Sequence, residues 1–146
     1  MKKAWITIAF VIVFIVPTFL CIHLYQQKAT EHKNLEATCE NSITSSLEYF
    51  QSYLATEKES DYIAGVSEFR VYMASYHCLM KMENNTNYVW CNALYGEMVL
   101  NAEEMKSHIP KLIAALEYLA TDYQHPNGFQ LIFNLTNQIE SKPSSN

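Results

Sequence analysis

Three cysteines are the residues of this chain whose chemistry is easiest to state. Cys39, Cys78 and Cys91 lie in segments with helical periodicity, and no two of them are in a C-x-x-C arrangement. If consecutive helices fold back as antiparallel neighbours, position 39 faces about position 77, and position 78 faces about position 93. The three thiols would then occupy one layer of a helical bundle. The spacing therefore predicts a disulfide.

Two pairings are open for this disulfide. Cys78–Cys91 closes the shortest loop and would clamp the turn around residues 84–87. Cys39 and Cys91, however, both lie on the apolar stripes of their helices, whereas Cys78 lies about 140° away from its stripe. Cys39–Cys91 is therefore the rival. Adding His77 would give a Cys₃His metal set, but His77 and Cys78 are adjacent and point about 100° apart, so neither a metal nor a cofactor is expected.

Catalytic signatures are missing from the sequence. Glu104 and His108 are four residues apart, but a helix boundary expected at Ser107 separates them, which favours a surface pair without a role. No G-x-S-x-G, H-E-x-x-H, Walker or dinucleotide pattern occurs. With three glycines in 146 residues, a glycine-rich phosphate loop is not indicated. We expect no enzyme, with thiol–disulfide exchange by the three cysteines as a minor exception.

Aromatic residues are frequent in the chain, which has ten tyrosines. Tyrosine and tryptophan are enriched at protein interfaces, and aromatic side chains between helices can line a ligand pocket. The competing interpretation is that tyrosines fill the margin of a small core. The candidate interface or pocket aromatics are Tyr62, Tyr72, Tyr76, Trp90 and Tyr95.

The elements that carry these residues have the spacing of amphipathic helices. Apolar residues recur every three or four positions in five segments, and four prolines and three glycines leave few breakers. Thr56 and Glu59 fit a capping box, and the Asn-rich run 84–87 indicates a turn. The prediction is an all-α fold, an antiparallel bundle of four to five helices. The segments are 35–54, 62–80, 88–106, 109–123 and 129–139.

The N-terminal residues predict a membrane anchor. Residues 4–25 contain no Asp, Glu, Lys or Arg, and about 20 apolar helical residues span a bilayer. Lys2 and Lys3 precede the run, which favours an inner N-terminus and an outer bundle. We expect an uncleaved single-pass anchor. The expected organisation is a cytoplasmic end at 1–3, a transmembrane helix at 4–25, a juxtamembrane segment at 26–34, a bundle at 35–140 and a disordered tail at 141–146.

Charge narrows the classes of partner. Without Lys2 and Lys3, eight basic residues stand against fifteen acidic ones, a formal charge of −7. Such a domain is not expected to bind nucleic acid. The sequence favours a membrane-anchored, non-enzymatic helical interaction module on the outer face of the cell membrane, which binds an envelope protein or itself. The alternative is an extracytoplasmic small-molecule-binding domain with an aromatic inter-helix pocket.

Overall fold

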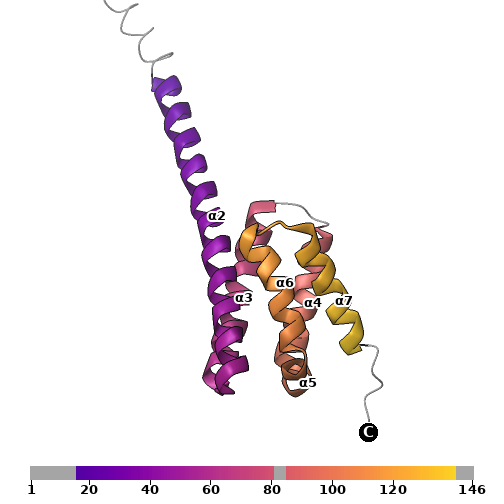
Figure 1. The fold of residues 1–146 in the computed structure, drawn as a ribbon. Helices are drawn as coiled ribbons and strands as arrows, with labels where there is room; N and C mark the ends of the chain where they lie inside the picture. Colours follow the sequence, from indigo (N-terminus) through magenta and orange to yellow (C-terminus); the bar gives the residue numbers. More distant parts are fainter. Residues whose placement is uncertain (1–15, 81–84, 141–146) are drawn as a thin grey trace, which may run out of the picture. The chain divides into compact units, whose positions relative to one another are not determined.

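The computed structural model describes residues 16–80 and 85–140, and every regular element in these two ranges is an α-helix. The predicted all-α fold is therefore confirmed. The chain divides into two compact units, Met1–Asn34 and Leu35–Asn146. The helices (Figure 1) are α2 (Val16–Thr56), α3 (Glu59–Met80), α4 (Thr86–Leu100), α5 (Ala102–Ser107), α6 (Ile109–Thr121) and α7 (Pro126–Glu140).

The first unit contains the predicted membrane anchor, of which residues 4–15 lie outside the described residues. Residues 16–34 are helical and belong to α2. Within the described part of the chain, no helix is both long enough and apolar enough to cross a membrane. Residues 16–25 nevertheless carry large apolar side chains that are each at least half exposed: Val16, Phe19, Leu20, Ile22, Leu24 and Tyr25.

In the second unit, a tight reversal joins α2 to α3. Glu57 has a φ of 55°, which is left-handed backbone, and its N–H donates to the carbonyl of Tyr53 at 2.7 Å. The hydroxyl of Thr56 accepts from the N–H of Lys58 at 3.4 Å. The predicted capping box is therefore incomplete, because α3 begins at Glu59 and the Glu59 carboxylate pairs with Lys106 instead of a backbone N–H.

Helices α2 and α3 approach closely at Gly65. The hydroxyl of Ser46 donates to the carbonyl of Gly65 at 2.9 Å. A Cβ atom at position 65 would lie 3.0 Å from the Phe50 ring, and Phe50 is fully buried. Glycine at this position therefore lets an aromatic ring of one helix lie against the backbone of the other.

One helix of the predicted bundle is divided in two. Residues 88–106 were predicted as one helix, but α4 ends at Leu100 and α5 begins at Ala102. The residue between them, Asn101, has φ −121° and ψ 43°, which is outside the helical region. Four to five helices were predicted for the bundle, and α5 is an additional helix in the described part of the second unit.

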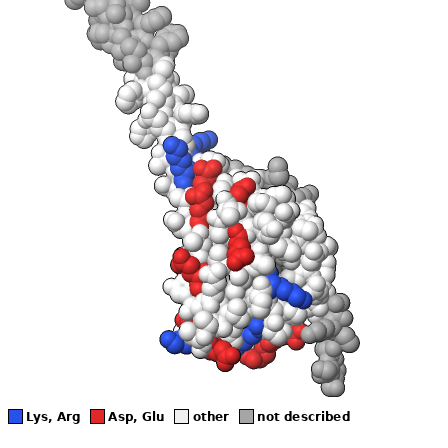
Figure 2. Space-filling view, in the orientation of Figure 1, with Lys and Arg blue, Asp and Glu red and all other residues white. Residues whose placement is uncertain are grey.

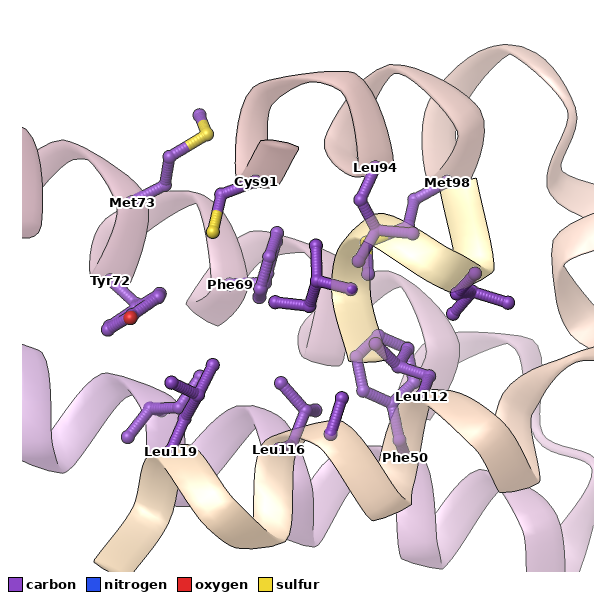
Figure 3. Packing of buried hydrophobic residues seen from close by; sticks show 14 of the residues in the cluster. Phe50, Phe69, Tyr72, Met73, Cys91, Leu94, Met98, Leu112, Leu116 and Leu119 are labelled. Carbon is purple, nitrogen blue, oxygen red and sulfur yellow. The ribbon is translucent and has the colours of Figure 1, made fainter. Parts of the chain in front are cut away.

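The hydrophobic core lies among these helices. Helix α7 packs against α4 and α6, beside which it runs in Figure 1. Figure 3 shows side chains from α2, α3, α4 and α6 meeting in one cluster. The largest fully buried members are Ile43, Phe50, Phe69, Tyr72, Leu94, Met98, Met105, Ile109, Leu112, Leu116, Leu119 and Phe129.

Candidate functional site

An apolar groove lies between α3 and the α4–α5 junction, and we call it the α3/α4 groove. Its volume is about 260 Å³. Apart from one carboxylate at its end, the side chains that line it are apolar or aromatic. They are Glu59, Tyr62, Ile63, Val66, Met98, Val99 and Ala102.

Tyr62 forms the floor of the groove and fixes its two walls. Its side chain is buried, and its hydroxyl donates to the carbonyl of Met98 at 2.8 Å. This bond ties α3 to the last turns of α4. Burial raises the pKa of Tyr62 to about 12, so the hydroxyl stays protonated and remains a donor at neutral pH.

The break at Asn101 leaves apolar side chains exposed beside the groove. The Asn101 side chain donates to Glu97 Oε2 at 2.6 Å, and its N–H donates to the Glu97 carbonyl at 2.9 Å. Just before it, Val99 is 53% and Leu100 is 82% exposed. On α3, Ile63 is 61% exposed. Ile63 and Val99 both line the groove, and the exposed Leu100 directly follows Val99 in α4.

A charged cluster closes one end of the groove. The amine of Lys106 lies 2.8 Å from a Glu59 oxygen and 2.7 Å from a Glu103 oxygen, and 5.4 Å from the centre of the Tyr62 ring. Hydrogen bonds to Glu103 and then to Glu59 raise the pKa of Lys106. One cation therefore holds two carboxylates beside an aromatic ring, and links α3 to α5.

The same end of the second unit carries further carboxylates. Asp61 accepts from the hydroxyl of Ser52 at 2.6 Å, and this hydrogen bond is the main reason that its pKa is lowered. Figure 2 shows acidic side chains gathered at the end of the bundle where the α2–α3 turn and α5 lie. The first turns of α3 and α5 supply Glu59, Asp61, Glu103 and Glu104.

A second groove, the α2/α6 groove, is polar. Its volume is about 520 Å³ and it contains the carboxylates of Glu40 and Asp122. The hydroxyl of Tyr123 donates to Glu36 Oε1 at 3.4 Å, and burial is the main reason that the pKa of Tyr123 is raised. Its lining residues are Glu40, Asn41, Thr44, Ala120, Thr121, Asp122 and Tyr123.

The five candidate aromatics do not meet at one site. Tyr62 alone of the five lines a groove described above. Tyr72 is fully buried, its hydroxyl donates to the Tyr123 carbonyl at 2.8 Å, and its ring lies 5.8 Å from that of the buried Tyr76. Trp90 packs on Phe133 with ring centres 4.8 Å apart. Tyr95 is half-buried against the core.

The predicted disulfide is corrected by the structure. Cys39, Cys78 and Cys91 are free thiols. Cys78 is exposed, whereas Cys39 and Cys91 are buried, as the position of Cys78 away from its stripe implied. The thiol of Cys39 lies 3.9 Å from the carbonyl of Tyr72, and the Cys91 side chain points toward Phe69 and Tyr72 in Figure 3. Counting residues from each turn predicted that the three cysteines lie in one layer of the bundle, but it did not predict the direction of each side chain.

The buried thiols are poor nucleophiles. Burial raises the pKa of Cys39 to about 12, and burial alone raises that of Cys91. Because the thiolate is the reactive form, both groups are suppressed at neutral pH. Among the described residues no set of three or more His, Cys, Asp or Glu side chains is placed to hold a metal ion.

Glu104 and His108, which were predicted to be separated by a helix boundary, contact each other in the structure. Nε2 of His108 lies 3.2 Å from Oε1 of Glu104. The expected obstacle was a helix boundary at Ser107, but α5 continues to Ser107 and His108 follows it directly. The i,i+4 spacing therefore survives. The ring of His108 is largely covered, which makes this pair a link across the α5–α6 junction.

The residues that sequence reasoning missed are Ile63, Val99 and Leu100. They lie next to the apolar stripes of their helices, and a period-based search assigns such residues to the margin of the core. The one available signal is Asn101, a residue type that favours turns and caps, which follows Val99 and Leu100 directly. Comparison of the chain with protein-family models, with curated proteins and with solved structures finds no match.

Proposed function

We propose that this protein is a non-enzymatic helical interaction module that binds another protein of the cell envelope or a second copy of itself. The observation that carries the proposal is the α3/α4 groove with its exposed neighbours Ile63, Val99 and Leu100. Exposed apolar side chains that line a groove with charged residues at its edge form the kind of surface that a protein partner can cover. The exposed Leu100 lies outside the core, so its apolar character contributes little to folding.

The groove suits a protein better than a small molecule. Ligand pockets usually enclose about 300–1,000 Å³, and the α3/α4 groove has about 260 Å³. The alternative function needs an aromatic pocket between helices, but Tyr72 packs on Tyr76, and Tyr76 packs on Phe129. A small polar ligand would have to use the larger α2/α6 groove, where Tyr123 supplies the one aromatic side chain of the lining.

The second part of the proposal is that residues 4–25 anchor the protein in the cell membrane, with the bundle on the outer face. Its support is the uncharged sequence of residues 4–25 and the exposure of Phe19, Leu20 and Tyr25 in the described part. An immunoblot of membrane and culture fractions tests it. A carbonate-resistant membrane form of full length is expected, and a soluble form shorter by about 25–30 residues, the usual length of a cleaved signal, would contradict it.

The burial of two of the three cysteine thiols also supports a binding function without catalysis. Thiol–disulfide exchange needs an accessible cysteine of low pKa, and the pKa values of Cys39 and Cys91 are raised by burial. Cys78 is exposed, but the two cysteines that could exchange with it are buried, so Cys78→Ser is expected to leave function intact. If this substitution abolished function while the protein still accumulated, the redox alternative would take precedence.

Site-specific photocrosslinking in intact cells tests the interaction itself. A photoreactive residue is placed at Ile63 or Val99, and in matched controls at Glu117 or Gln130, which are exposed positions of α6 and α7. We expect adducts of defined mass from the two groove positions and none from the controls. Mass spectrometry distinguishes a partner protein from a self-dimer. Equal labelling at all four positions, or none at any, would contradict the proposal.

A further inference from the structure

The shape of the α3/α4 groove limits what can occupy it. Its walls are two helices, and its floor is formed by Tyr62, Val66 and Met98. Of these, Tyr62 and Met98 are buried and tied together by the hydrogen bond between them. The floor is therefore set in advance. A rigid apolar channel between helices is the usual receptor for the apolar face of an amphipathic helix, which inserts side chains spaced three and four residues apart.

The charges around the groove select among such helices. Glu59 lines the groove with 57% of its side chain exposed, and Glu103 beside it is 90% exposed. Lys106 lies between them and is itself 16% exposed, so the surface that an incoming chain meets is the two carboxylates. Basic side chains complement this end of the groove.

A second copy of the chain fits less well. In a symmetric dimer the same patch of both subunits comes together. The one cation of this charged cluster, Lys106, is only 16% exposed, so the same patch of a second copy offers no accessible basic side chain to Glu59 and Glu103, and the charges of the two patches are not complementary. The net charge of the whole chain, −5, acts in the same direction.

We propose that the α3/α4 groove binds a basic amphipathic helix of another protein, with its apolar residues on Ile63 and Val99 and its Lys or Arg side chains over Glu59 and Glu103. This inference rests on the proposed interaction function and specifies the partner's chemistry. In this proposal the apolar contacts provide the affinity, and the carboxylates select a basic ligand over an acidic one.

A designed peptide tests this proposal on the full-length protein in a neutral detergent. The probe is a fluorescein-labelled helix about five turns long with leucine on one face and lysine elsewhere, and its affinity is measured by fluorescence anisotropy. One control peptide replaces each lysine by glutamate, and another replaces each leucine by serine. We expect measurable binding of the leucine–lysine peptide only, and an affinity that falls as salt is raised.

Variants of the protein separate binding in the groove from binding to detergent or to other surfaces. Val99→Ser is expected to weaken binding about tenfold, because a buried valine side chain contributes roughly that factor. Its matched control, Val89→Ser, changes another exposed valine of α4 and should leave the affinity unchanged. Glu103→Lys should weaken binding several-fold, whereas Glu117→Lys on α6 should not. Circular dichroism verifies that each variant is folded.

Each result decides the proposal in one direction. Equal binding of the lysine and glutamate peptides, or equal effects of the changes at Val99 and Val89, would overturn it. Crosslinks from Ile63 that join two copies of the chain, with no peptide binding, would also overturn it and leave self-association as the function. Crosslinks to a different protein whose contact segment is acidic would keep the interaction function and reject the basic helix.

Discussion

Gly65 offers a quantitative test of how α2 and α3 pack, because the same substitution at a second helical glycine supplies the reference. Gly65→Ala adds one methyl group, 3.0 Å from two carbons of the Phe50 ring. Gly96→Ala adds the same methyl group in α4, where nothing lies within 4 Å of the new atom. Both positions are inside helices. The gain in helix propensity is therefore shared, and the packing differs.

The magnitude of the effect follows from two opposing contributions. Alanine is favoured over glycine inside a helix by about 0.5–1 kcal/mol, so Gly96→Ala should raise the free energy of unfolding by about that amount. At position 65, overpacking opposes this gain and typically costs about 1–3 kcal/mol. Phe50 has little room to withdraw, because it is fully buried and its ring lies 5.9 Å from that of Tyr62. We expect Gly65→Ala to be less stable than Gly96→Ala by about 1–3 kcal/mol.

Urea denaturation followed by circular dichroism measures this difference. The double variant Gly65→Ala with Phe50→Leu provides a further test, because a smaller side chain at position 50 makes room for the new methyl group. The double variant should be more stable than the sum of the two single changes predicts, by about 0.5 kcal/mol or more, as expected for residues in contact. If Gly65→Ala were as stable as Gly96→Ala, the close approach of α2 and α3 derived from Gly65 would be refuted.

Two further predictions concern stability. The pKa values of Cys39 and Cys91 are raised from 9.0, that of Cys39 to about 12. The folded state therefore keeps protons that the unfolded chain releases, so this contribution to stability is complete below pH 9 and is lost as the pH rises toward 12. Each thiol should lower the free energy of unfolding by about 1.4 kcal/mol per pH unit in this window. Cys91→Ala should give a shallower slope in denaturation curves at several pH values, and an unchanged slope would contradict the assignment. Separately, Glu57→Gly should raise the free energy of unfolding by about 0.5–1 kcal/mol, because glycine adopts a φ of 55° without the cost paid by other residues. Glu57→Ala, which keeps a Cβ, should be close to neutral in the same urea titration.

A helix was predictable from the sequence where its apolar residues recur with a single helical period. The stripe of Ile109, Leu112, Leu116 and Leu119 is buried along α6, and Pro110 stands in its first turn as its ring requires. The cap supplied by Asn85, whose side chain accepts from the N–H of Tyr88 at 3.2 Å, also follows from residue type. In both places local preference and burial agree, so a single sequence is sufficient.

The break between α4 and α5 was not predictable in the same way. Leu94, Met98 and Met105 are buried on both sides of Asn101, so the apolar period continues through the interruption. A single residue that leaves the helical region changes the direction of the following segment without changing which side chains are apolar. The disulfide failed for a related reason, because register arithmetic places Cys39 and Cys78 at similar heights and leaves their directions undetermined.

The α3/α4 groove depends on contacts between distant residues, and the periodic pattern of apolar residues does not reveal such contacts. Tyr62 was named as a candidate aromatic from its residue type, but its role as the floor of the α3/α4 groove depends on the bond to the Met98 carbonyl and on Lys106 above its ring. Both partners are distant from Tyr62 in sequence, and both belong to the segment in which the helix is interrupted. Contacts between residues so far apart in sequence do not follow from the period of one helix, and so the groove could not have been assembled from the sequence.

The apolar residues at the end of α4 differ in whether folding alone explains their type. Met98 is buried and its loss would leave a cavity, so folding alone accounts for its type. Leu100 is 82% exposed, and substitutions at such positions usually change stability by less than about 0.5 kcal/mol. A single exposed leucine needs no explanation. Leu100 is adjacent to Val99, however, and Val99 lines a groove whose opposite wall carries the exposed Ile63. We expect the bundle to fold with polar residues at these three positions, and under the proposed function a partner that covers them accounts for their apolar character.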